Sequence, residues 1–149
     1  AIALDVHSGF GAVDRLWYPY ARSVGDYPRE DLCTQFAQRL DEFEANHVYR
    51  IEPQSVQYTT HGDLWDHLFD LHTEQHGLNG NLFLPWTLEM GSWVWLRKNP
   101  WQIFNALGAF NPIKPHRYRR TMRRHARLID FLIHLTASPD QWRASMTPS

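Results

Sequence analysis

Short apolar segments alternate with helical patterns along this chain, and no tight hairpin turn joins one apolar segment to the next. Three segments have the pattern of strands, at 1–7, 48–53 and 81–90. Three have the pattern of helices, at 28–45, 62–75 and 117–137. A helix therefore follows each strand, which is typical of layered α/β domains. We expect a mixed sheet flanked by helices.

Length and composition narrow the class of protein. A chain of 149 residues is enough for one domain, spanning 1–149, with one hydrophobic core. Fifteen basic and sixteen acidic residues give a formal net charge of -1, so no global attraction to nucleic acid or to an anionic membrane is expected. No apolar run approaches the roughly 18 to 20 residues that span a bilayer. The single cysteine, Cys33, excludes an internal disulfide and favours a reducing compartment such as the cytoplasm.

The apolar residues also predict which faces are buried. The helix at 28–45 should turn one face inward, formed by Leu32, Phe36, Leu40 and Phe43. The inward face expected for 117–137 comprises Tyr118, Met122, Ile129, Leu132 and Ile133. The nearly continuous apolar run at 1–7 predicts a central strand that is covered on both faces. Pro85 predicts a bulge or an unpaired position within 81–90, and 144–149 should be frayed.

His7 is the first candidate for a functional residue. It ends the apolar strand and is followed by Ser8, Gly9 and, two residues later, Gly11. A histidine at the carboxyl end of a strand lies at the edge where α/β proteins bind ligands, and neutral imidazole is a common zinc ligand. The alternative is a core histidine that is hydrogen-bonded to a backbone carbonyl.

Glu89 is the second candidate, at the end of the apolar strand 81–90. Removing a carboxylate from water raises its pKa toward the range that suits a general base. The alternative is a residue that leaves the sheet and pairs with an arginine such as Arg97.

The segment 57–70 is the third candidate. Tyr58 precedes a glycine turn at Gly62, and Asp63 and Asp66 lie in the first turn of the following helix. The simpler reading is that both aspartates stabilise the helix N-terminus, where the helix dipole favours negative charge.

Taken together, these three segments resemble the zinc carboxypeptidases, the metallocarboxypeptidase family. The opening strand, with His7 and Ser8 followed by the triplet Tyr18, Pro19 and Tyr20, resembles the strand that carries that family's third zinc ligand. Tyr58, Gly62 and Asp66 resemble the family's tyrosine loop and the helix that builds its specificity pocket. Thr87-Leu88-Glu89 resembles the family's T-x-E strand with its catalytic glutamate.

This resemblance implies a zinc-dependent hydrolase that cleaves a peptide or an acyl-amino acid. It assigns His7 as a metal ligand and Glu89 as the catalytic glutamate. Tyr58, Ser8 and Asp66 become substrate contacts, and Trp65 lies at the floor of the specificity pocket, where its uncharged ring argues against basic side chains.

The resemblance covers residues 1–93 and corresponds to the later half of the family's catalytic domain. The family's HxxE zinc motif precedes that half, and none of the nine histidines here has a glutamate three positions later. We therefore expect an incomplete carboxypeptidase-like sheet that needs the N-terminal half of the same domain for its remaining zinc ligands. By itself the chain should be inactive, should bind zinc poorly and is open to self-association through exposed strand edges.

Two other functions remain open. His72 and His76, with Glu74 between them, share a helix face, but two histidines are too few for a structural zinc site. The segment 117–127 carries six arginines and one histidine, and a binding module could use them to hold a polyanionic partner. The alternative for these arginines is the solvated face of a terminal helix.

Overall fold

A four-stranded mixed sheet forms the centre of the computed structural model, which describes residues 1–9, 11–25 and 27–138. The strands are β1 (Ile2–Ser8), β2 (Arg15–Tyr18), β3 (Arg50–Pro53) and β4 (Leu84–Met90), in the spatial order β1-β4-β2-β3. β1 runs parallel to β4 and β2 parallel to β3, whereas β2 and β4 are antiparallel. The expected mixed sheet with flanking helices is thus confirmed. The segment 144–149, expected to fray, lies outside the described residues.

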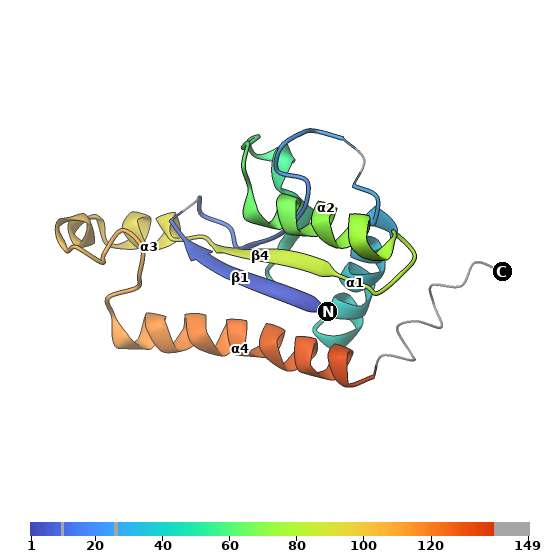
Figure 1. Cartoon of the computed structure of the whole chain (residues 1–149). Coiled ribbons are helices and arrows are strands. Elements are labelled where there is room, and N and C mark those ends of the chain that lie inside the picture. The colour runs from blue at the N-terminus through green and yellow to red at the C-terminus, as the bar shows by residue number, and fades with distance from the viewer. Residues whose placement is uncertain (10, 26, 139–149) are drawn as a thin grey trace.

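The helices are α1 (Glu30–Phe43), α2 (Leu64–His76), α3 (Trp93–Lys98) and α4 (Pro115–Ala137), with short 3-10 turns at Gln54–Val56 and Pro100–Phe104. Three of the four helices agree with the sequence pattern, and α3 was not predicted. Figure 1 shows α2 on one side of β1 and β4, and α4 on the other side. Within the described ranges, no helix combines the length and the apolar character that crossing a bilayer requires.

The core lies between the sheet, α1 and α4. Leu16, Leu84, Trp86 and Leu88 supply it from the strands and are all buried. Phe36 of α1 stacks on Trp86 with 4.1 Å between ring centroids, and Phe131 of α4 packs edge-on against Phe36. Because side chains alternate along a strand, these apolar residues leave the opposite face of the sheet to their polar neighbours in sequence. That second face lies under α2.

Local capping fixes where α2 begins. Asp63 is its N-cap, and its carboxylate accepts hydrogen bonds from the backbone N–H groups of Trp65 and Asp66. Gly77 ends the helix with a positive φ of 71°, a conformation that favours glycine. The predicted role of Asp63 at the helix N-terminus is confirmed, and the cap places the first turn of α2 over the polar face.

The predicted central position of the first strand is wrong. β1 lies at the edge of the sheet, with β4 as its single partner among the described residues. Ile2 and Leu4 pack on the core from one face, but Val6 is 53% exposed. The centre is occupied instead by β4, whose residues from Leu84 to Leu88 are all buried. The short strand β2, which the sequence pattern did not reveal, separates β4 from β3.

The inward face predicted for the last helix is also wrong, except at Leu132, which packs against the core. Tyr118, Met122, Ile129 and Ile133 are exposed, and Leu132 is half-buried. The buried residues of α4 are His125, Leu128 and Phe131. α4 has apolar residues on two sides, and contact with α1 selects the side that carries Phe131.

Pro85 agrees in part with its prediction. It keeps regular register opposite Ala3 of β1, without a bulge, but lies beyond the last residue of β4 that pairs with β2.

Candidate active site

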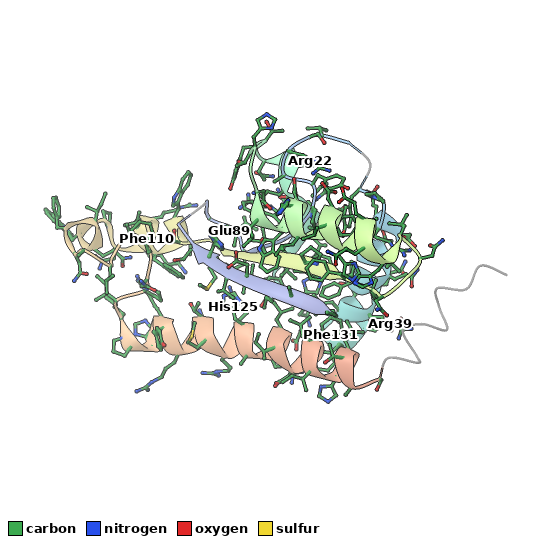
Figure 2. All side chains as sticks on the ribbon, viewed as in Figure 1. Arg22, Arg39, Glu89, Phe110, His125 and Phe131 are labelled. Atoms are coloured by element: carbon green, nitrogen blue, oxygen red, sulfur yellow. The ribbon has the colours of Figure 1, made fainter. Side chains whose placement is uncertain are left out.

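The second face of the sheet gathers charged side chains from all four strands. In the β1–β4 ladder His7 lies directly opposite Glu89, and Asp5 lies opposite Thr87. On the other side of β4, Arg15 of β2 is the register partner of Glu89. Register partners point to the same face of a sheet, so Glu89 is flanked by an imidazole and a guanidinium. Figure 2 shows Glu89 on the α2 side of the sheet, with His125 on the α4 side.

His7 is held in place by a neighbouring carboxylate. Its Nε2 lies 2.8 Å from Asp5 Oδ2, and the indole Nε1 of Trp65 donates to the same oxygen at 3.1 Å. Burial acts to raise the pKa of Asp5, but the hydrogen bonds from His7 and Trp65 outweigh it and lower that pKa. His7 Nδ1 makes no hydrogen bond with the described residues, and the side chain is 52% exposed. A carboxylate that fixes one ring nitrogen and leaves the other available is the arrangement typical of metal-binding histidines.

Glu89 lies deeper, with 6% of its surface exposed, beside Arg15, which is 8% exposed. The alternative pairing with Arg97 is not seen, since Arg97 makes no ion pair with the described residues and points to solvent on α3. Burial raises the pKa of the Tyr58 phenol, and the negative charge of the Glu89 carboxylate raises it further, so Tyr58 lies near Glu89. The structure therefore brings together His7, Glu89 and Tyr58 on one face.

Glu52 of β3 organises the inner part of this face. Its Oε1 accepts hydrogen bonds from Arg15 Nε at 3.2 Å, Trp17 Nε1 at 3.4 Å and Gln57 Nε2 at 2.8 Å. Trp17 in turn packs edge-on against Tyr58, with 5.8 Å between ring centroids. Glu52 thus fixes both the guanidinium beside Glu89 and the ring that supports Tyr58.

Asp66 has a structural position. It is 3% exposed, and its two carboxylate oxygens accept hydrogen bonds from the backbone N–H groups of Ala21 and Arg22, each at 3.0 Å. Burial raises the pKa of this carboxyl despite those bonds. The carboxylate therefore secures the 20–22 loop against α2, and the structure does not present it to a substrate.

The two remaining predicted substrate residues differ. Ser8 follows His7 on the strand, so alternation puts it on the opposite face of the sheet, and the structure does not bring it to His7. Trp65 is half-buried and borders a narrow hollow with Trp17 and Thr87. That hollow is too narrow for a water molecule.

The described residues do not form a complete metal site. No group of three or more His, Cys, Asp or Glu side chains among them is arranged to hold an ion. The rings of His72 and His76 are neighbours, 4.7 Å apart, but lack a third donor. Catalytic zinc sites use three protein ligands. By themselves, these residues offer one imidazole and do not fit a zinc centre.

Sequence reasoning missed Arg15, Glu52 and Asp5. Asp5 had a usable signal, because it stands two residues before His7 and must share its face in a strand. Arg15 and Glu52 had no such signal, because the pairing of β2 with β3 and β4 is what brings them to the site.

A comparison of the chain with protein-family models, curated protein sequences and solved structures found no match.

Proposed function

We propose that this chain carries the general base and one zinc ligand of a carboxypeptidase-type hydrolase that cleaves peptide or amide bonds. The observation that supports this most directly is the register of β1 and β4, which sets His7 opposite Glu89. Asp5 orients His7, and Tyr58 lies near Glu89. Zinc-dependent hydrolysis of an amide uses a metal ligand, a general base and a hydrogen-bond donor to the substrate. We assign these roles to His7, Glu89 and Tyr58, which lie on one face of the sheet.

In the proposed reaction Glu89 moves a proton. Its carboxylate takes a proton from water as the water oxygen bonds to the substrate carbonyl carbon. Glu89 then gives that proton to the departing nitrogen as the carbon–nitrogen bond breaks, which yields a carboxylic acid and an amine. Tyr58 hydrogen-bonds the substrate near the scissile bond, and the indole of Trp65 lines the pocket for an uncharged side chain.

Zinc, when bound, polarises a carbonyl and lowers the pKa of its water. His7 offers Nδ1 for it, and the described residues offer no complete ligand set. The proposal therefore includes a second source of ligands, an N-terminal half of the same domain. Residues 1–149 alone should then be inactive and bind zinc weakly, since affinity needs several ligands held together.

The test uses the natural polypeptide that contains this sequence, assayed with zinc on N-acyl amino acids and short peptides. We expect hydrolysis that a chelator abolishes and that Glu89→Gln lowers by about 10²- to 10⁴-fold, the range for loss of a general base. His7→Ala should lower bound zinc. The control Glu74→Gln removes an exposed carboxylate from α2 and should change neither.

Retained activity in the Glu89→Gln protein would contradict the role of the base. Tight stoichiometric zinc binding by residues 1–149 alone would contradict the shared ligand set.

A further inference from the structure

A groove of about 750 Å³ lies between α4 and the segment that joins α1 to β3. Figure 1 shows α4 on the side of the sheet opposite α2 and the candidate active site. The volume is within the range of pockets that bind small organic molecules. Its lining is divided between basic and apolar side chains. The basic ones are His47, His116, Arg120, Arg123, Arg124 and Arg127.

The four arginines come from one face of α4. Counted from Arg120, the others follow three, four and seven residues later, the spacing that places side chains on one face of a helix. Arg124 pairs with Asp14 at 3.0 Å, and Arg127 pairs with Glu44 at 2.8 Å. Arg120 and Arg123 are exposed and have no hydrogen bond or ion pair with the described part of the protein. Two guanidinium groups at the groove are therefore available to a ligand.

Without a bound anion, the arginines on this face of α4 repel one another. Like charges four residues apart on a helix destabilise it, and the face holds two such pairs, Arg120 with Arg124 and Arg123 with Arg127. Asp14 pairs with Arg124, and Glu44 pairs with Arg127, which also lies near the charge of Asp130, so the positive charges of Arg120 and Arg123 are the ones left without an ion pair among the described residues. A bound anion would remove the remaining repulsion. Guanidinium groups bind phosphate by paired, charge-assisted hydrogen bonds.

The floor of the groove is apolar and fixed. Leu40 and Leu128 are each 1% exposed and belong to the core. Tyr49 lies beside them, and its hydroxyl is 2.9 Å from Nδ1 of the buried His125. Val48 adds a further apolar side chain. A floor of this kind fits the ring or hydrocarbon part of a ligand and offers little to a bare inorganic ion.

We propose that this groove binds a soluble, phosphate-bearing organic molecule of nucleotide size. Its phosphates bind Arg120 and Arg123 at the rim, and its apolar part packs on Val48 and Tyr49. The site is independent of the proposed hydrolase, because no residue of the groove belongs to the polar face under α2.

Titration calorimetry on residues 1–149 tests the proposal, with nucleoside diphosphates, pyrophosphate, a short oligonucleotide and vesicles that contain a phosphoinositide as probes. We expect a nucleoside diphosphate to bind more tightly than pyrophosphate or the vesicles. The variant Arg120→Gln/Arg123→Gln should weaken that binding about a hundredfold, as expected for the loss of two charge-assisted contacts. The control Arg97→Gln/Arg119→Gln makes the same change of charge at exposed positions outside the groove and should stay within about twofold.

Three results would overturn the inference. The first is the absence of binding, or binding that both double variants weaken equally; equal weakening would mean attraction by net charge alone. The second is tight binding to the vesicles only, which would assign the groove to a lipid headgroup. The third is salt-dependent binding of an oligonucleotide more tightly than any diphosphate, which would make α4 a nucleic-acid surface.

Discussion

Replacement of Asp70 by asparagine tests how α2 is held over the polar face. Arg22 donates to both carboxylate oxygens of Asp70, from Nη2 to Oδ1 at 3.1 Å and from Nη1 to Oδ2. Tyr20 Oη also donates to Oδ1, at 3.0 Å, and the Arg22 guanidinium lies 4.0 Å from the centre of the Tyr20 ring. One carboxylate thus joins the 20–22 loop to α2, the helix that carries Trp65.

The expected loss of stability is about 1.5 kcal/mol. The ion pair is partly exposed, with 39% of the Arg22 side chain and 33% of the Asp70 side chain accessible, so solvent screening limits its contribution to about 1 kcal/mol or less. The hydrogen bond from Tyr20 adds about 1 kcal/mol, and the asparagine oxygen retains part of it. For a chain of this length the loss corresponds to a decrease in Tm of about 3–6 °C.

The pH dependence gives the sharper measurement. The hydrogen bond from Arg22 is the main cause that lowers the pKa of Asp70. A carboxyl with a lowered folded-state pKa stabilises the protein above its unfolded value of about 3.9, and this stabilisation is lost as the pH falls further. The difference in the free energy of unfolding between wild type and Asp70→Asn, measured in urea, should have its full size at pH 7 and should decrease below about pH 4.

Glu74→Gln, an exposed change on the same helix, serves as the control and should stay within about 0.5 kcal/mol of wild type. A deficit of the same size in both variants, or one that persists undiminished at pH 3, would refute the reasoning.

Two further predictions concern the other side of the sheet and the turn after β4. Burial lowers the pKa of His125, whose surroundings include Asp14, Arg124 and Tyr49, so its stabilising effect is present above about pH 6.5 and is lost as the pH falls. His125→Gln should therefore show a smaller loss of unfolding free energy between pH 7.5 and 5.5 than wild type, and parallel curves for the two proteins would count against this. Gly91→Ala should cost about 1–3 kcal/mol in urea unfolding, because its Cβ would lie 2.5 Å from the backbone nitrogen of Val13. Gly25→Ala, where the nearest atom is 3.8 Å away, is the control, and equal costs at the two glycines would disprove the close-contact argument.

The sequence predicted the helices and strands themselves better than it predicted which strands are adjacent in the sheet. The helix pattern at 28–45 led to α1, whose Leu32, Phe36 and Leu40 are buried as predicted. The central position was assigned to β1 because of its apolar run, but β4 occupies it. Apolar content alone does not distinguish a strand with one partner from a strand with two. β2 has only four residues, and it can be identified as a strand only from its pairing with β3 and β4.

The face of α4 could not be predicted for a related reason. Its apolar residues form two stripes, one through Met122 and Ile129 and the other through Leu128 and Phe131. Both have helical spacing, and the aromatic rings of α1 decide between them. In the candidate site, single residues with chemical character such as His7 and Glu89 could be named in advance. Arg15 and Glu52 could not, because their proximity arises from strand pairing between distant segments.

The edge position of β1 determines which side chains would lie beside a strand added to the sheet. Along its outer side β1 pairs with no strand of the described chain, so its backbone groups there are a template for one more. Neighbouring strands lie about 4.8 Å apart, and a newcomer in register would set every second side chain beside Asp5 and His7. A single histidine or carboxylate at the correct step of that strand would then stand next to the imidazole, while the four existing strands kept their present order.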